Sequence, residues 1–79
     1  MDYDNRITGQ LIGMLRARRG MSQEQLSGLA GMARSHLAMI ESGAKNPNVD
    51  TLWRIAGALG LPLSELIRMV ETEIQRHSG

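Results

Sequence analysis

The amino-acid sequence predicts an all-α protein built from five helices. Apolar residues recur every three or four positions along most of the 79 residues, the spacing typical of helices with one buried face. Glycine, proline and asparagine interrupt this pattern at intervals, where turns are expected. The chain has one Trp, one Tyr and no Phe, and an aliphatic core suits packed helices better than a β-sandwich.

The length allows one small domain with one hydrophobic core. We therefore expect residues 1–79 to form a single domain, with its core at about residues 5–67. The remainder, at about residues 68–77, is expected to be a C-terminal extension of the fifth helix.

The first helix is expected from about Asn5 to Arg19, with Gly20 ending it. Its inward face has three residues at helical spacing, namely Thr8, Ile12 and Leu15. A second stripe lies on another face and consists of Ile7, Leu11 and Met14. This second stripe could bind a partner or seat the fifth helix, and we favour packing within the chain.

The second helix begins with a clear start signal. Ser22 is a typical N-cap, and Gln25 three residues later completes a capping box. Gly31 can end the helix in the left-handed conformation. The apolar face between these two signals is expected to consist of Leu26, Leu29 and Ala30.

The third helix follows directly and begins near Ala33. Leu37, Ile40 and the stem of Glu41 form its apolar side until Gly43 stops it. Two short helices joined by a glycine turn have the geometry of a helix-turn-helix. The second helix of such a pair can enter the major groove of DNA.

The fourth helix follows a turn at residues 43–47. Asn48 is expected to cap it, and Asp50 lies in its first turn, where a negative charge suits the helix dipole. Gly60 closes the helix. Its inward stripe is expected to be Leu52, Ile55, Ala56 and Leu59.

The fifth helix begins at Pro62 and runs toward His77. Its apolar stripe consists of Leu63, Leu66, Ile67, Val70 and Ile74. The first three residues can close the core, whereas the last two are expected to expose apolar surface in a monomer. The tail could fold back on the first helix, but we favour a two-fold dimer contact. The expected contact residues are Trp53, Leu66, Met69, Val70 and Ile74.

Composition disfavours several classes of protein. The absence of cysteine excludes disulfides and thiol nucleophiles and favours a cytoplasmic location. The N-terminal residues MDYDNR lack the apolar segment of a signal peptide, and no apolar run approaches the ~18 residues that span a membrane. No set of side chains has the spacing of an enzyme active site or a metal site. We therefore expect no catalysis, metal, cofactor or small-molecule ligand.

The net charge of +1 argues only weakly for nucleic acid, but its distribution is informative. Residues 5–54 contain seven basic and three acidic residues, which gives this segment +4. Residues 1–4 contribute −2, and residues 55–79 contribute −1. The positive charge therefore lies where the helix-turn-helix pattern lies.

Residues 9–67 resemble the phage repressor/Cro-type helix-turn-helix domain of the XRE family. The matching stretches are Leu15-Arg16, Arg19-Gly20, SQEQL at Ser22–Leu26, Ala30-Gly31, Arg34–Leu37, Ile40–Gly43, Asn46-Pro47 and ALGLPLSEL at Ala58–Leu66. The short length and the extended fifth helix also look like controller proteins of restriction–modification systems. The resemblance implies a five-helix repressor-like fold and double-stranded DNA as a partner.

The resemblance makes the third helix the recognition helix. Its expected base-reading residues are Arg34, Ser35, Ala38 and Met39. Arg34 can pair bidentately with guanine, although a phosphate contact is nearly as plausible. Ala38 and Met39 can only contact thymine methyl groups, so DNA shape is expected to contribute to specificity.

The resemblance also implies phosphate contacts, made from the start of the second helix and from the turn before the fourth helix. The expected residues are Ser22, Gln23, His36, Lys45, Asn46, Asn48 and Arg19. Ala33 stands where the family commonly has a Ser or Thr cap, so one such contact is missing. Arg16 and Glu41 are implied to form a partly buried ion pair that ties the recognition helix to the first helix.

These observations predict a transcriptional regulator that binds a near-palindromic operator as a homodimer. The alternative is a protein-interaction module, such as an antitoxin or an adaptor, that uses the same fold. The apolar residues Ala38 and Met39 and the low net charge leave this alternative open.

Overall fold

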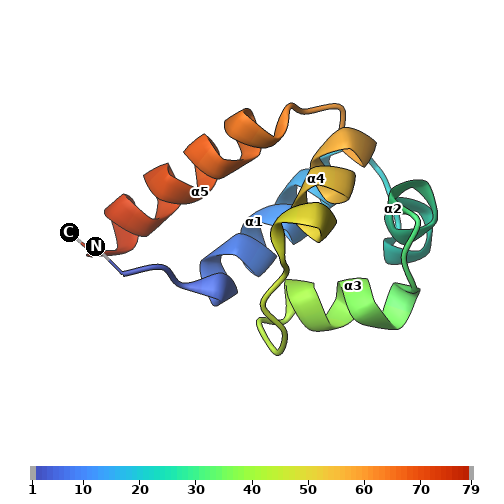
Figure 1. The fold of residues 1–79 in the computed structure, drawn as a ribbon, viewed down its shortest axis with the longest axis horizontal. Coiled ribbons are helices and arrows are strands. Elements are labelled where there is room, and N and C mark those ends of the chain that lie inside the picture. The colour runs from blue at the N-terminus through green and yellow to red at the C-terminus, as the bar shows by residue number, and fades with distance from the viewer. Residues whose placement is uncertain (1, 79) are drawn as a thin grey trace.

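The computed structural model describes residues 2–78 and consists of five helices joined by short turns (Figure 1). The helices are α1 (Asn5–Arg18), α2 (Gln23–Ala30), α3 (Arg34–Glu41), α4 (Val49–Ala58) and α5 (Leu63–Ser78). No strand occurs within residues 2–78, and the predicted five-helix fold is confirmed. None of these helices combines the length and the apolar character needed to cross a membrane.

The predicted helix boundaries rest on local signals that the structure contains. The Ser22 hydroxyl accepts a hydrogen bond from the Gln25 amide at 3.0 Å, and the Gln25 side chain accepts one from the Ser22 amide at 2.8 Å. Gly31 ends α2 at φ 69°, a left-handed conformation that suits glycine. Asn48 caps α4 by accepting from the Thr51 amide at 2.8 Å. The turn that separates α2 from α3 is thus specified by its own residues.

Helix α1 lies in the middle of the molecule and organises the rest. It packs against α3 on one side and α5 on the other, while α2 contacts both α3 and α4. As a result α3 and α5 lie at opposite edges of the fold (Figure 1).

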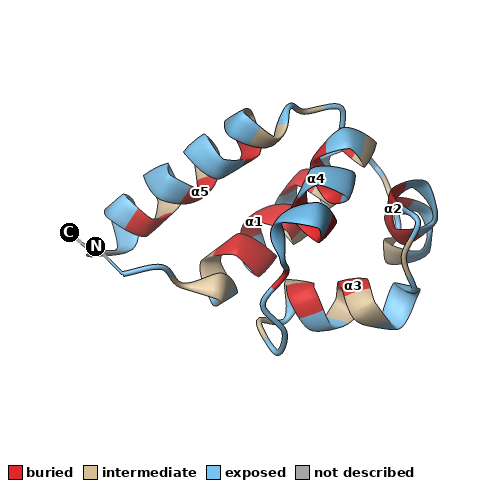
Figure 2. Ribbon diagram, viewed as in Figure 1, coloured by how far each residue is buried: buried red, intermediate tan, exposed pale blue. Residues whose placement is uncertain are grey.

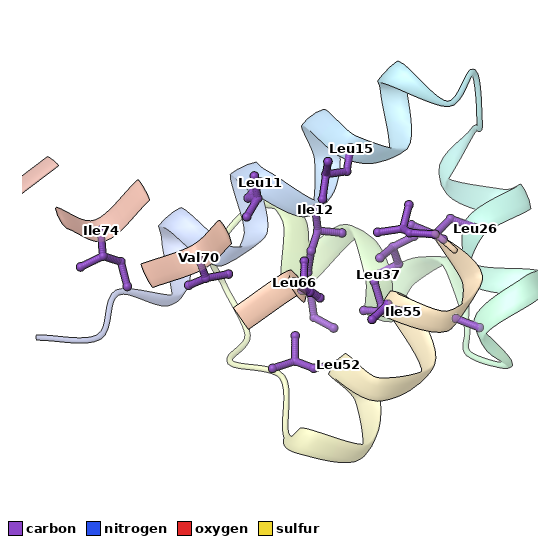
Figure 3. Close-up of a cluster of buried hydrophobic side chains, with 14 residues drawn as sticks. Leu11, Ile12, Leu15, Leu26, Leu37, Leu52, Ile55, Leu66, Val70 and Ile74 are labelled. Atoms are coloured by element: carbon purple, nitrogen blue, oxygen red, sulfur yellow. The ribbon is translucent and has the colours of Figure 1, made fainter. Parts of the chain in front are cut away.

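All five helices contribute to one aliphatic core (Figures 2 and 3). Thr8, Ile12 and Leu15 of α1 are buried as predicted, and so is the predicted stripe of α4. The largest fully buried apolar side chains are Ile12, Leu26, Leu37, Ile40, Ile55 and Leu66. Complete burial of such a side chain stabilises the fold by about 1.5–3 kcal/mol.

The expectation that the end of α5 exposes apolar surface is wrong. Leu66, Val70 and Ile74 are at most 6% exposed and belong to the same core as Leu11. Their side chains point from α5 into that cluster (Figure 3). The reason is that α5 folds back along α1, so Ile7 and Leu11 seat it. These three residues of α5 are therefore not available as a dimer contact.

Two further residues differ from the predicted core. Leu29 is 68% exposed, because α2 turns Leu26, Ser27 and Ala30 inward and leaves Leu29 on its outer flank. Ile67 is 37% exposed and lies on the side of α5 toward α4, where it lines an open hollow with Trp53 and Gly57. Both residues add apolar character to the surface rather than to the core.

Candidate nucleic-acid interface

Helix α3 packs against the core with one side and exposes its opposite side to solvent. Leu37 and Ile40 are completely buried on its inner side. Arg34, Ser35 and Met39 are exposed on its outer side, and Ala38 lies half-buried beside them. Figure 2 shows the exposed N-terminal end of α3 at the edge of the molecule. The structure therefore brings the four predicted base-reading residues together on one accessible surface.

Arg16 and Glu41 form the expected ion pair between α1 and α3. The guanidinium donates from Nε to one carboxylate oxygen at 2.8 Å and from Nη2 to the other at 3.0 Å. Arg16 also donates to the Met21 carbonyl at 2.8 Å. Hydrogen bonding to Glu41 raises the pKa of Arg16 above its usual value, although burial acts in the opposite direction. A bidentate pair of this kind fixes both distance and direction.

Gln23 joins the same cluster from α2. Its amide donates to the Glu41 carboxylate at 3.1 Å, so Glu41 binds side chains from two other helices. The start of α2 and the end of α3 are thus connected through one carboxylate. The phosphate contact expected of Gln23 stays a prediction, and its side chain is already held beside α3.

Helix α1 approaches α3 closely at two glycines, meeting the backbone of α3 at Gly9 and the Glu41 side chain at Gly13. A Cβ at Gly9 would overlap the Ile40 carbonyl oxygen and lie 2.9 Å from that of Glu41. A Cβ at Gly13 would lie 3.1 Å from the Glu41 carboxylate. Only glycine allows this approach at residue 9, and sequence reasoning missed its role. Together with the ion pair, this contact sets the position of α3.

The other predicted phosphate-binding residues lie on four different segments. Ser22 is exposed at the start of α2, His36 is half-buried within α3, and Arg19 is exposed at the end of α1. Lys45, Asn46 and Asn48 are exposed in the segment between α3 and α4. Ala33 is the N-cap of α3, and no side chain caps this helix. The first turn of α3 therefore relies on other groups for its amides.

A family model described as helix-turn-helix matches residues 12–66, which include all of α2, α3 and α4 and both members of the Arg16–Glu41 pair. The chain belongs to the helix-turn-helix family of XRE type. Its sequence relatives include transcriptional regulators, and the resemblance stated above is confirmed.

Two relatives illustrate the range of this helix-turn-helix family. The immunity repressor of Bacillus phage phi105 is 42% identical over 59 residues, covering 75% of the chain but only 41% of the repressor. The chain thus spans less than half of that relative. An uncharacterised helix-turn-helix regulator of Sinorhizobium fredii, y4dJ, is 34% identical over 62 residues, covering 78% of the chain and 80% of the regulator.

Solved structures show the same arrangement of helices. The restriction–modification controller C.AhdI of Aeromonas hydrophila has a TM-score of 0.77 at 35% identity, covering 80% of this chain and 96% of its own. A tyrosine-to-phenylalanine mutant of controller protein C.Esp1396I bound to its highest affinity operator site has a TM-score of 0.85, covering 95% of this chain and 99% of its own. At 23% identity the latter likeness concerns the fold.

Arg54 of α4 contacts the helix-turn-helix, a role that sequence reasoning missed. From α4 its guanidinium donates to the Gly31 carbonyl at 3.0 Å, in the turn between α2 and α3. It also forms an ion pair with Asp50 at 3.1 Å. The four-residue spacing of Asp50 and Arg54 was the only available signal. The contact with Gly31 depends on how α4 packs against α2.

Trp53, a predicted dimer residue, protrudes from the surface formed by α4 and α5. Its side chain is 67% exposed and lines an open hollow of about 670 Å³ with Gly57, Leu63 and Ile67. Met69 is half-buried and lies elsewhere, in the groove between α1 and α5. The structure therefore keeps Trp53 accessible but does not bring Trp53 and Met69 together.

Proposed function

We propose that this protein is a transcriptional regulator that reads a specific DNA operator with the N-terminal half of α3. The observation that carries the proposal is the anchoring of α3 by buried Leu37 and Ile40 and by the Arg16–Glu41 pair, which leaves its outer side free. A helix held at a fixed angle with exposed polar residues can enter the major groove. Arg34 would read guanine, and Met39 would contact a thymine methyl group.

Phosphate contacts would position α3 on the duplex. Ser22 and Gln23 at the start of α2 would bind one backbone segment, because helix N-termini attract anions. Lys45, Asn46 and Asn48, in the segment that joins α3 to α4, would bind a second backbone segment. His36 and Arg19 would add further contacts. Such contacts carry little sequence information but supply much of the affinity.

A homodimer would present two copies of α3 to a near-palindromic operator, about 34 Å apart. The α4–α5 surface supports this because it combines an exposed apolar side chain with an adjacent open hollow. Trp53 protrudes, and Gly57 one turn later leaves a hollow beside it. In a two-fold contact each Trp53 would fill the hollow of the other subunit. Since Leu66, Val70 and Ile74 are buried, the contact would use Trp53, Leu63 and Ile67 instead.

The DNA-binding proposal is tested by selecting operators from a randomised duplex pool, with Arg34→Ala as the matched variant. We expect an inverted-repeat consensus. The logarithm of the binding constant for it should fall linearly with the logarithm of the salt concentration, with a slope of roughly 0.9 for each phosphate contact. Arg34→Ala should weaken binding and relax the consensus at one position, while leaving thermal stability unchanged. A pool without a consensus would contradict the proposal and favour the adaptor alternative.

The dimer is tested separately by comparing Trp53→Ala with Leu66→Ala in sedimentation and thermal unfolding. Trp53→Ala should shift the protein to monomer with little loss of stability. Leu66→Ala should destabilise each subunit by about 2–5 kcal/mol, because it opens a cavity in the core. A dimer that survives loss of Trp53 would contradict the proposal that this surface is the dimer contact.

A regulator of this kind acts on bacterial DNA, so we also place it in the cytoplasm.

A further inference from the structure

The groove between α1 and α5 is a second hollow, on the other flank of α5 from Trp53. It has a volume of about 500 Å³, and its lining includes Met14 and Arg18 from α1 and Met69 from α5. Ile67, which lines the Trp53 hollow, and Met69 point in directions about 160° apart on a helix. The two hollows therefore do not overlap, and covering one leaves the other open.

The groove combines an apolar floor with a positive rim. Met14 is 37% exposed and Met69 is half-buried, and methionine side chains adapt readily to the shape of a partner. The charged lining residues are Arg18, Arg68, Arg76 and Glu73. Arg68 pairs with Glu65 and Arg76 with Glu73, whereas Arg18 has no ion pair within residues 2–78. The rim thus has an excess of positive charge.

The groove also faces away from the candidate DNA interface. Helix α1 meets α3 through Gly9 and Gly13. Met14 and Arg18 lie on the opposite side of the same helix, toward α5. An occupant of the groove and DNA on α3 could therefore be bound at the same time.

We propose that this groove binds an acidic, amphipathic segment of a partner protein. An apolar side chain of the segment lies on Met14 and Met69, and flanking carboxylates meet Arg18 and Arg76. Charge complementarity of this kind gives specificity and a fast association rate. A nucleic-acid backbone fits less well, because it has no apolar group for the methionine floor.

The probe is a short synthetic peptide that forms a helix with leucines on one face and glutamates beside them. A control peptide has glutamine at every glutamate position. We expect amide chemical shifts of the ¹⁵N-labelled protein to change along the α1–α5 groove when the acidic peptide is added. The glutamine peptide should bind at least about tenfold more weakly, and salt should weaken the acidic peptide further.

Two variants of the protein complete the test. Because Arg18 has no ion pair within residues 2–78, the variant Arg18→Glu should keep the fold. It should weaken peptide binding at least about tenfold. Arg34→Glu should leave peptide binding unchanged while abolishing operator binding. The proposal is overturned if the peptide fails to bind, if shifts appear on α3 or around Trp53, or if both peptides bind equally. It is also overturned if Arg18→Glu weakens operator binding as Arg34→Glu does, since the groove would then contact DNA.

Discussion

Helix α1 holds its two neighbours in different ways. Its junction with α3 is directional, with a bidentate ion pair and a glycine contact that allows one close approach. Its junction with α5 consists mainly of aliphatic side chains such as Leu11, Val70 and Ile74. Aliphatic packing stabilises the contact between two helices without fixing the angle between them, whereas hydrogen bonds have preferred angles and fix the orientation of the groups that they join. The helix that must keep its angle is therefore the one with the directional contacts.

The largest expected effect comes from closing the glycine contact. Gly9→Ala places a methyl group on the Ile40 carbonyl oxygen, which α1 can relieve only by moving away from α3. We expect a loss of more than about 3 kcal/mol in the free energy of unfolding, measured by urea denaturation. Gly28→Ala is the matched control, because its Cβ would meet no atom within 4 Å. The control should be neutral or stabilising by up to about 1 kcal/mol.

Breaking the ion pair is expected to have the next largest effect. Arg16→Met leaves the Glu41 carboxylate, 10% exposed, without its main partner, and should cost about 2–3 kcal/mol. Operator affinity should fall as well, because α3 loses its fixed direction. The double variant Arg16→Met/Glu41→Leu should recover most of the stability but not the affinity. Full recovery of both properties would remove the distinction between the two junctions.

A smaller effect is expected at the turn between α2 and α3. Arg54→Met removes the hydrogen bond to the Gly31 carbonyl and should cost about 1 kcal/mol in thermal unfolding. Asp50→Asn is the control, because it weakens the ion pair but keeps the contact with Gly31. If the two variants lose equal stability, the ion pair rather than the turn contact is responsible.

The smallest expected effect is a gain. Ala33→Ser supplies a side-chain cap to α3 and should stabilise the protein by about 0.5–1 kcal/mol. The change is measured as a higher unfolding midpoint, with Ala33→Val as a control that lacks a hydrogen-bond acceptor. No gain for serine would indicate that the first amides of α3 are already satisfied.

The sequence predicted the features that depend on neighbours in the chain. Ser22 with Gln25, Gly31 and Asn48 are local signals, and the structure contains all three. The Arg16–Glu41 pair joins residues 25 positions apart and was available only through a family resemblance. The helix ends could thus be predicted from local chemistry, whereas the ion pair between α1 and α3 could be predicted only from the family resemblance.

The features that were missed depend on how helices pack. The apolar stripe of α5 was identified, but periodicity cannot show whether α1 or another subunit covers Val70 and Ile74. Leu29 fits the helical period yet stays outside, because α2 turns Leu26, Ser27 and Ala30 toward the core. Gly9 and Arg54 contact backbone carbonyls of segments that are distant in the chain. Every residue has a backbone carbonyl, so no residue type in the sequence indicates these contacts.

The division of α3 into an anchored side and an open side bears on how such a protein can evolve. Arg34, Ser35 and Met39 contribute little to the core, so substitutions there should change stability by no more than about 0.5 kcal/mol. Mutation can therefore alter the preferred target while the scaffold stays intact. A lineage with this design can acquire new binding preferences without passing through unfolded intermediates.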